Sequence, residues 1–369
     1  MFSLWGDGKR AGAVFLCEAQ MSPAERHLGA STPEMRYREP TRQMPGFDDL
    51  LGQDAAKTTL ERAFSSGKIH HAYRFEGPPG VGKTFAARLL ARALVCERGI
   101  GCGTCSSCTR AMSLAAEGPE IPGHPDVIMV GRGLYPASLI GSQESTGISV
   151  DQIRKIVLPR MGYGPHEGRA LVVIILDADE LTIAAANSLL KTLEEPPQNT
   201  HFILVTSRPK RLIDTIASRT IRVRFAPLPK AALGALLRAE GLSPEDDLLE
   251  RAQGSLDRAR LLGSEEERAT YANFVEAVAK AVEARDPSGA VRFAESRPGE
   301  RDTLLDHLRY LGTSYALRER ERAELAPERL GEFAEDHRKV LRATRAIEQN
   351  CSPALALEAL ILELTDRPR

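Results

Sequence analysis

The stretch that decides the fold is Gly77-Pro78-Pro79-Gly80-Val81-Gly82-Lys83-Thr84. It fits the phosphate-loop pattern G-x-x-x-x-G-K-[ST] at every fixed position, between a predicted strand at 73–76 and a predicted helix from Phe85 to Val95. The glycines let the backbone curl so that successive N–H groups and the helix N-terminus face a phosphate. Lys83 is expected to reach the outer phosphates of ATP, and Thr84 to offer its hydroxyl to Mg²⁺. The predicted phosphate-binding residues are Gly77, Gly80, Val81, Gly82, Lys83 and Thr84.

Short apolar, β-branched runs alternate with amphipathic stretches over residues 47–225. The runs at 171–176 and 202–206 are continuous, as expected of parallel strands buried on both faces. Further strands are predicted at 73–76, 126–130 and 221–225, with a strand-like entry at 50–53. Helices are predicted from Asp54, over 148–158 and over 184–194, where Pro196-Pro197 ends the last one. This alternation predicts an α/β domain with a doubly wound parallel sheet.

Pro227 and Pro229 mark the end of this domain, and no strand is predicted beyond them. Residues 44–226 are therefore interpreted as the nucleotide-binding domain, followed by a small helical unit at 227–264 and a longer helical unit at 265–369. Residues 1–43 show no sustained periodicity and mix Gly, Pro, Arg and Glu, so we expect a poorly ordered extension. Acidic residues in this segment argue against a transit peptide.

The charges nearly cancel, with 49 Lys+Arg against 50 Asp+Glu among 369 residues. Bulk charge therefore predicts no nucleic-acid footprint, and any such contact must be local or shared with other subunits. No stretch approaches the roughly 20 continuous apolar residues that span a bilayer, and the first residues lack the pattern of a secretory signal. We expect a soluble cytoplasmic protein without membrane contact.

Four of the six cysteines lie within thirteen residues: Cys96, Cys102, Cys105 and Cys108. Cys17 and Cys351 are isolated. In a reducing compartment this clustering favours a metal over disulfides. Thiolates two residues apart can both face one tetrahedral Zn²⁺, and three glycines within the segment supply the backbone freedom for its turns: Gly99, Gly101 and Gly103. A structural zinc site without chemistry of its own is predicted at 96–108; the alternative is a loop of reduced thiols without metal.

Several stretches of the chain are characteristic in combination: Leu51-Gly52-Gln53, His71-Ala72-Tyr73-Arg74-Phe75, the phosphate loop, the four-cysteine insert, Val150-Asp151-Gln152-Ile153-Arg154, Ala186-Asn187-Ser188-Leu189-Leu190-Lys191-Thr192-Leu193-Glu194-Glu195-Pro196-Pro197, and Ser218-Arg219. Together they resemble bacterial DNA polymerase III clamp-loader subunits of the AAA+ class, closely over residues 47–225 and more loosely beyond. Residues 353–360 are similar to the closing helix of the family's oligomerisation collar.

The resemblance implies an AAA+ domain with a zinc-binding insert, a helical lid at 227–264 and an all-α collar at 265–369. This family uses ATP to place a ring-shaped sliding clamp on primer–template DNA, acting as a hetero-pentamer of gamma/tau, delta and delta prime subunits. Each ATP site receives an arginine finger from a neighbouring subunit. Ser218-Arg219 matches the finger motif, although Thr220 stands where Cys is usual, so Arg219 is expected to stabilise the transferring phosphoryl group of the next subunit.

The same resemblance locates the groups that act on Mg²⁺ and the γ-phosphate. Motor subunits carry Asp-Glu where this chain has Leu176 and Asp177, so Asp177 alone is left to bind Mg²⁺ or position water. Asp179 is a substitute if the backbone bulges. Thr206, followed by Ser207, matches the strand end whose hydroxyl senses the γ-phosphate.

These departures favour nucleotide binding without efficient hydrolysis, which resembles the delta prime stator of the family. The end of the chain soon after the collar-like helix also favours the delta prime type. An active gamma/tau-type motor ATPase is the alternative, supported by the intact Lys83-Thr84. An alternative of another class is a zinc-containing nucleic-acid-binding protein with a vestigial P-loop, which the lack of aromatic residues within the cysteine cluster disfavours. Arg258 falls one place later than the lid arginine of the motor and is expected on a helix surface.

Overall fold

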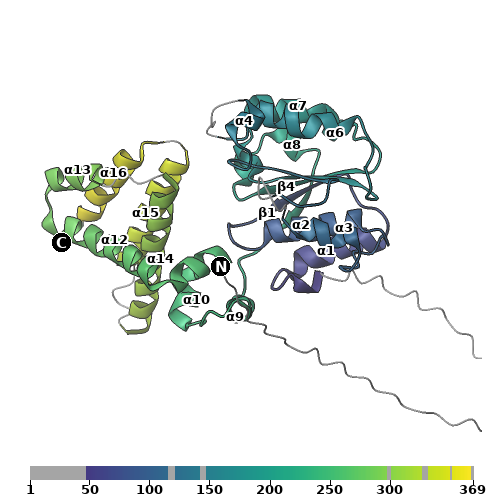
Figure 1. The fold of residues 1–369 in the computed structure, drawn as a ribbon. Coiled ribbons are helices and arrows are strands. Elements are labelled where there is room, and N and C mark those ends of the chain that lie inside the picture. The colour runs from purple at the N-terminus through teal and green to yellow at the C-terminus, as the bar shows by residue number, and fades with distance from the viewer. Residues whose placement is uncertain are drawn as a thin grey trace, which may run out of the picture. The chain divides into compact units, whose positions relative to one another are not determined.

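The computed structural model describes residues 47–114, 121–141, 147–296, 301–325, 331–349 and 351–366. The extension predicted at 1–43, with Cys17, lies outside these ranges. Within them the chain forms a parallel β-sheet covered by helices, followed by a helical region (Figure 1).

The sheet contains five strands in the described residues, in the order β2-β3-β4-β1-β5. They are β1 (Ala72–Glu76), β2 (Val127–Val130), β3 (Leu171–Ile175), β4 (Thr200–Thr206) and β5 (Ile221–Arg224). Every neighbouring pair is parallel, and the register places Glu76 opposite both Thr206 and Arg224. The carboxyl ends of β1, β4 and β5 therefore meet at one edge, where ligands bind in open α/β sheets. The predicted parallel sheet is confirmed.

Helices cover both faces of the sheet (Figure 1). One face carries α1 (Asp54–Ser65), α2 (Lys83–Val95) and α3 (Ser106–Met112). The other carries α4 (Ala137–Ile140), α6 (Leu158–Met161), α7 (Ile183–Glu194) and α8 (Asp214–Ala217). The helix predicted over 148–158 is present as α5 (Val150–Gln152), a π-helical turn (Ile153–Val157) and the start of α6.

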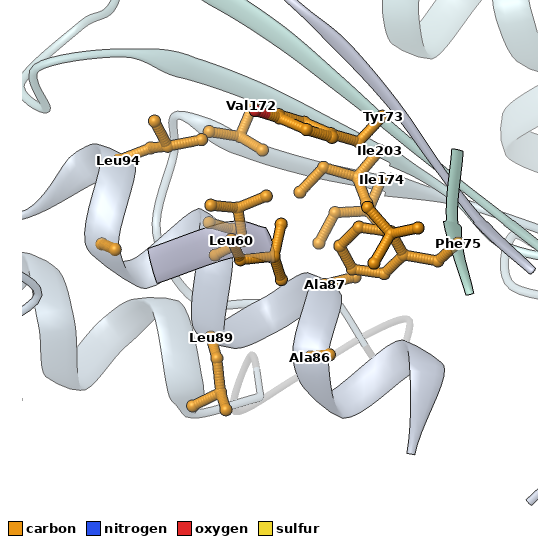
Figure 2. Close-up of a cluster of buried hydrophobic side chains, with 14 of the residues drawn as sticks. Leu60, Tyr73, Phe75, Ala86, Ala87, Leu89, Leu94, Val172, Ile174 and Ile203 are labelled. Atoms are coloured by element: carbon orange, nitrogen blue, oxygen red, sulfur yellow. The ribbon is translucent and has the colours of Figure 1, made fainter. Parts of the chain in front are cut away.

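The core between α2 and the sheet combines small helix residues with large strand residues (Figure 2). Ala87 is fully buried on α2 and lies beside Phe75 of β1, where its small side chain lets the helix approach the sheet closely (Figure 2). Each buried Phe or large aliphatic side chain contributes roughly 1.5–3 kcal/mol to folding. This packing holds the N-terminus of α2, which begins at Lys83, close to the carboxyl ends of the strands.

The strand-like entry predicted at 50–53 is wrong. Phe47–Asp49 forms a 3₁₀ helix, and residues 50–52 turn into α1 with Gly52 at φ +69°. A Cβ on Gly52 would lie 2.8 Å from the Cδ atom of Pro229, so the turn requires glycine in both conformation and space.

Gln53 explains why this segment turns rather than pairs with the sheet. Its buried amide donates to the carbonyl groups of Val81 (3.2 Å) and Ala226 (2.6 Å) and accepts from the N–H of Ala226 (3.0 Å). The side chain thereby joins the phosphate loop to the segment after β5, and a strand at 50–53 would not place it there.

After β5 the described residues are helical, as predicted. The first three helices, α9 (Lys230–Ala239), α10 (Asp246–Ala252) and α11 (Leu256–Gly263), share a leucine-rich core. A second core is formed by α12 (Glu265–Ala284), α13 (Pro287–Glu295), α14 (Arg301–Leu325), α15 (Glu332–Glu348) and α16 (Pro353–Thr365). Among the described helices, none has the length and apolar character needed to cross a membrane.

Candidate functional site

The phosphate loop joins β1 directly to α2. Gly80 and Gly82 adopt φ values of +72° and +90°, a region that glycine enters without steric cost. A Cβ on Gly77 would lie 2.4 Å from the carbonyl oxygen of Phe225, so glycine is also required for this close approach. Because α2 begins at Lys83, its first N–H groups face the loop and are free of intrahelical partners, which is the arrangement that binds phosphate.

The side chain of Lys83 folds back over the loop. It is only 6% exposed, and its ammonium group donates to the carbonyl of Gly77 (2.8 Å), to that of Pro78 and to the hydroxyl of Ser207 (3.0 Å). Burial lowers the pKa of Lys83 to about 8, although three nearby carboxylates act in the opposite direction. A bound polyphosphate would bring compensating negative charge to this buried ammonium.

A cavity of about 530 Å³ opens beside the loop. Its polar lining includes Lys83, Thr84, Asp177 and Ser207. Its apolar lining comes from the turn before α1 and from the helical region: Leu50, Leu51, Leu228, Leu236 and Leu256. The volume and the mixed lining suit a small molecule with both an anionic and an apolar part.

The end of β3 contributes a single carboxylate to this cavity. Asp177 has φ 44° and ψ 50°, so the backbone turns sharply immediately after β3. The Asp177 side chain is exposed and lines the cavity. Partial desolvation, and after it the charges of Asp179 and Glu180, raise the pKa of Asp177. Leu176 packs against the core and donates its N–H to Val130 (2.8 Å), and its side chain has no metal-binding atom.

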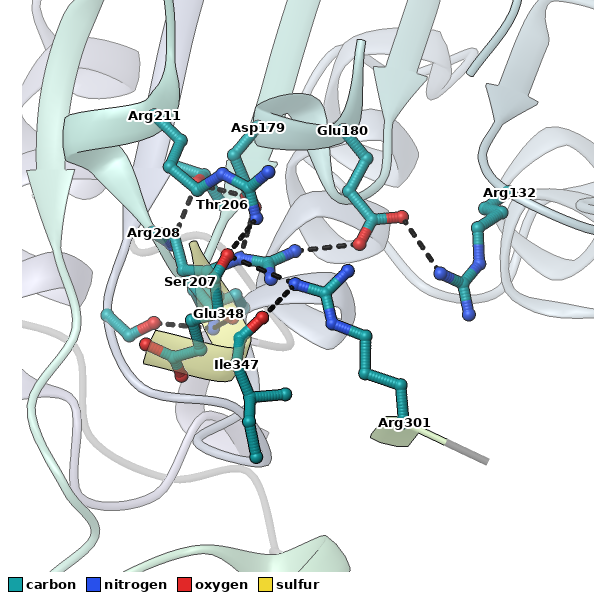
Figure 3. A network of polar contacts seen from close by, with 12 residues as sticks. Arg132, Asp179, Glu180, Thr206, Ser207, Arg208, Arg211, Arg301, Ile347 and Glu348 are labelled. Atoms are coloured by element: carbon teal, nitrogen blue, oxygen red, sulfur yellow. Dashed lines mark hydrogen bonds and ion pairs between the residues drawn. The ribbon is translucent and has the colours of Figure 1, made fainter. Parts of the chain in front are cut away.

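The two acidic residues after Asp177 are engaged in an ion-pair network (Figure 3). Asp179 is buried, and its two carboxylate oxygens accept from Thr206 Oγ1 (2.5 Å) and Arg208 Nε (2.7 Å). The same guanidinium donates to Glu180 (2.7 Å), which also lies 3.6 Å from Arg132. The backbone does turn at Asp177, but both oxygens of Asp179 are bonded within this network, and Asp179 is absent from the lining of the 530 Å³ cavity. It lines, with Asp177 and Ser207, another cavity of about 730 Å³ on the side of Arg208.

Two adjacent hydroxyl groups at the end of β4 have different partners. Thr206 is fully buried and donates to Asp179, whereas Ser207 lines the cavity and contacts Lys83. Ser207 is therefore the hydroxyl of this pair that faces the cavity beside the phosphate loop.

Arg219 follows α8 and is not part of the cavity lining of its own chain. Its half-exposed guanidinium forms an ion pair with Glu194 at the end of α7 and donates to the carbonyl of Thr215 (2.8 Å). These contacts hold the side chain beside α7 with part of the guanidinium open to solvent.

Arg258 is partly exposed on α11. It lines a second cavity of about 210 Å³ together with Tyr271 and Arg309, and burial lowers its pKa. It is absent from the lining of the cavity beside the phosphate loop, where Asp257 and Arg260 of the same helix are present instead. Neither Asp257 nor Arg260 was predicted as a site residue from the sequence, where they lie one place before and two places after Arg258.

The four clustered cysteines converge as predicted. Their sulfur atoms all lie within 4.8 Å of one another, with separations of 3.7 Å for Cys96–Cys102, 4.0 Å for Cys96–Cys105 and 3.9 Å for Cys102–Cys108. A tetrahedron with metal–sulfur bonds of about 2.3 Å has edges of about 3.8 Å, so the set fits a metal ion bound by four thiolates.

The surroundings act in opposite directions on two thiols of this cluster, because burial raises the pKa of Cys108 whereas backbone hydrogen bonds lower that of Cys102. Hydrogen bonds from the N–H groups of Thr104 and Cys105 lower the pKa of Cys102 to about 6. The three glycines between the ligands have φ values of +67°, +64° and +74°: Gly99, Gly101 and Gly103. Cys351 is exposed and lies outside the cluster.

A parallel sheet with this loop between its strand β1 and helix α2 is the arrangement of a P-loop fold. Residues 52–229 also match the family model of the DNA polymerase III, delta subunit. Over this region, which is just under half of the 369 residues, the chain is similar to DNA polymerase III subunits of the clamp loader.

Individual relatives include more than one subunit type. The DNA polymerase III subunit gamma/tau of Mycobacterium tuberculosis is 37% identical over 222 residues, which cover 58% of this chain and 36% of that protein. The tau subunit of Escherichia coli is 35% identical over 57% of this chain and 31% of its own length. The delta' subunit of Bacillus subtilis is 34% identical over 64% of this chain and 60% of its own length. The chain thus spans about a third of the gamma/tau and tau relatives.

Proposed function

We propose that this chain is the delta prime-type stator of a DNA polymerase III clamp loader. It binds ATP with Mg²⁺ in the P-loop cavity, hydrolyses it slowly or not at all, and donates Arg219 to the ATP site of an adjacent subunit. Its partners are gamma/tau and delta subunits in a hetero-pentamer, the sliding clamp and primer–template DNA.

The observation that carries the proposal is that the end of β3 brings a single free carboxylate, Asp177, to the phosphate loop. Asp177 is exposed in the cavity, but Leu176 precedes it and both oxygens of Asp179 are already bonded to Thr206 and Arg208. Phosphoryl transfer depends on carboxylates that hold Mg²⁺ and on a group that orients the attacking water. One short carboxylate supports binding of the metal–nucleotide complex better than turnover.

The nucleotide ligands follow from the residues present. Lys83 would pair with the outer phosphates, and Thr84 with Asp177 would hold Mg²⁺, which neutralises charge on the phosphate oxygens. Ser207 lies within hydrogen-bond distance of Lys83 and would sense its movement toward a phosphate. The apolar lining would take the base.

Arg219 suits a role in trans because it is solvent-accessible and absent from its own cavity lining. Its pairing with Glu194 is an exposed contact of the kind that contributes about 1 kcal/mol or less, so a neighbour's phosphate can replace it. In the cysteine cluster, a structural Zn²⁺ is the metal that a closed set of four thiolates favours.

An active gamma/tau-type motor is the second candidate, because the phosphate loop is intact and relatives named gamma/tau are 37% identical over 222 residues. The two candidates differ in where hydrolysis occurs. Steady-state ATP turnover by the isolated chain is therefore measured beside Lys83→Ala, and ATP binding is measured in parallel. The stator hypothesis predicts Lys83-dependent ATP binding with negligible ATP turnover. Substantial Lys83-dependent turnover would reject it in favour of the motor hypothesis.

The role in trans is tested with gamma/tau-type subunits of the same organism added to the chain. Arg219→Ala should reduce ATP turnover at the single site that the finger completes by about 10³-fold or more. The total turnover of the mixture should therefore fall by the share that this site contributes. The matched control is Arg222→Ala, an exposed arginine three residues further on in β5. Equal effects of the two variants, or no effect of either, would reject the finger.

A further inference from the structure

The first turn of α11 packs directly on the phosphate loop. The N–H of Leu256 donates to the carbonyl of Gly80 at 2.7 Å. A Cβ on Gly80 would lie 2.1 Å from Ser255 Oγ and 3.1 Å from Asp257 Oδ2. The bare glycine therefore permits a close contact that places the Asp257 carboxylate against the loop that receives phosphates.

The negative charge of Asp257 is only partly neutralised in this position. Arg260 lies 3.3 Å from it, but the same guanidinium forms two shorter hydrogen bonds to Glu240, at 2.8 and 2.5 Å. The Asp257 side chain is 67% exposed, lines the nucleotide cavity and acts electrostatically on Lys83.

The charged lining of the cavity is unusual for a polyphosphate site. Four carboxylates face two cations: Asp49, Asp177, Glu240 and Asp257 against Lys83 and Arg260. Asp177 can be neutralised by Mg²⁺, and Glu240 is bound to Arg260. Asp257 is the carboxylate that the α11 contact holds at the phosphate loop itself.

We propose that Asp257 opposes polyphosphate binding, so that nucleotide occupancy depends on the position and charge of the first turn of α11. This inference rests on the nucleotide binding proposed above. Repulsion between like charges raises the dissociation constant, and α11 must shift away from Gly80, or Asp257 must gain a cationic partner, for full affinity. The site is thereby held weak in the isolated chain.

Asp257→Asn tests the repulsion, and Asp247→Asn is a closely matched control. Asp257 is the second residue of α11 and pairs with Arg260, and Asp247 is the second residue of α10 and pairs with Arg251. Both aspartate side chains are 67% exposed. Asp247 is outside the lining of the nucleotide cavity. The two variants lose the same charge and the same helix-terminal interaction, and they differ in distance from the loop.

Binding of MgATP and of inorganic tripolyphosphate is measured by calorimetry at low and at high salt. Asp257→Asn should bind both about tenfold more tightly at low salt, since a unit charge a few ångströms away in a hydrated cavity has an effect of that order. The gain should shrink at high salt because the repulsion is screened. Asp247→Asn should match the wild type.

The outcomes separate this inference from the proposed function. If the wild type binds MgATP and Asp257→Asn binds it no more tightly, or Asp247→Asn gains equally, the repulsion is rejected and nucleotide binding stands. If neither the wild type nor Asp257→Asn binds MgATP or tripolyphosphate, both the nucleotide-binding role and this inference fail. Tighter binding of ATP without tighter binding of tripolyphosphate would also reject a repulsion acting on the phosphates.

Discussion

The ammonium group of Lys83 lies 3.0 Å from the hydroxyl oxygen of Ser207, so the phosphate loop and the end of β4 are joined by a hydrogen bond across 124 positions of sequence. Thr206, one residue earlier, bonds to Asp179 on another side of the strand. Thr206 is the last residue of β4 and Ser207 follows it, so the two side chains point in different directions. One hydroxyl therefore belongs to the cavity, and its neighbour belongs to a buried network.

Nucleotide binding should take up protons. In the free chain Lys83 titrates at a pKa of about 8, and bound polyphosphate raises that pKa because it favours the ammonium form. Between the two pKa values the complex holds more protons than the free chain, so affinity falls as the pH rises above about 8.

Calorimetry at about pH 8 in two buffers of different ionisation enthalpy measures this uptake. The control is Lys83→Arg, whose guanidinium does not titrate in this range and should show no uptake. Identical binding heats for the wild type in both buffers would contradict the prediction.

Thr206→Val and Ser207→Ala should affect different properties. The first removes the donor to one oxygen of the buried Asp179 carboxylate, whose other oxygen keeps Arg208, and should lower the free energy of unfolding by about 1–3 kcal/mol. The second removes a hydroxyl at the cavity and should change stability by less than about 1 kcal/mol while altering nucleotide affinity. Urea denaturation of both variants measures the difference, and an equal or larger loss for Ser207→Ala would reverse the assignment of the two hydroxyls.

Asp126 should be a main source of acid sensitivity. Its fully buried carboxylate accepts from the N–H groups of residues 166–168, at 2.6, 2.9 and 2.7 Å, and from Arg160 at 3.0 Å. Burial disfavours the charge, but the backbone hydrogen bonds outweigh it and lower the pKa of Asp126 below its ordinary value of 3.8. The stabilisation is thus complete above that value and is lost as the pH falls through the lowered pKa.

Asp126→Asn should cost about 3–5 kcal/mol at neutral pH, because the amide presents a donor where several donors converge. The difference from the wild type should narrow as the solution is acidified, since asparagine does not titrate. A difference that stays constant down to the acid transition would show that another group causes the acid sensitivity.

The cysteine cluster should hold about one zinc ion per chain when the protein is purified without chelator. Removing the metal, or replacing Cys102 by Ser, should lower the melting temperature because the segment is ordered through its ligands. Metal analysis and thermal unfolding measure the two effects, with Cys351→Ser as a control that keeps the metal. A metal content far below one per chain would reject the zinc site.

The sequence alone determined the features that are written in contiguous residues. The phosphate loop, the spacing of Cys96 to Cys108 and the apolar runs of the strands each have a local pattern, and the structure contains the predicted strands and the converging sulfur atoms. Such patterns are readable because side-chain periodicity and ligand spacing depend on neighbouring residues. The turn at 50–53 was wrongly predicted as a strand because it is stabilised by a hydrogen bond from Gln53 to Ala226, which lies 173 residues away in the sequence.

The tertiary structure alone decided which side chains meet in the nucleotide cavity. The engagement of Asp179 by Thr206 and Arg208, the position of Ser207 at Lys83 and the contact of Asp257 with the loop all join separate segments. Each depends on strand register and on the close approach of α11 to Gly80. These contacts follow from how the cores pack, and no local sequence pattern encodes them. A shift of β4 by one residue, for example, would exchange the positions of the Thr206 and Ser207 hydroxyl groups.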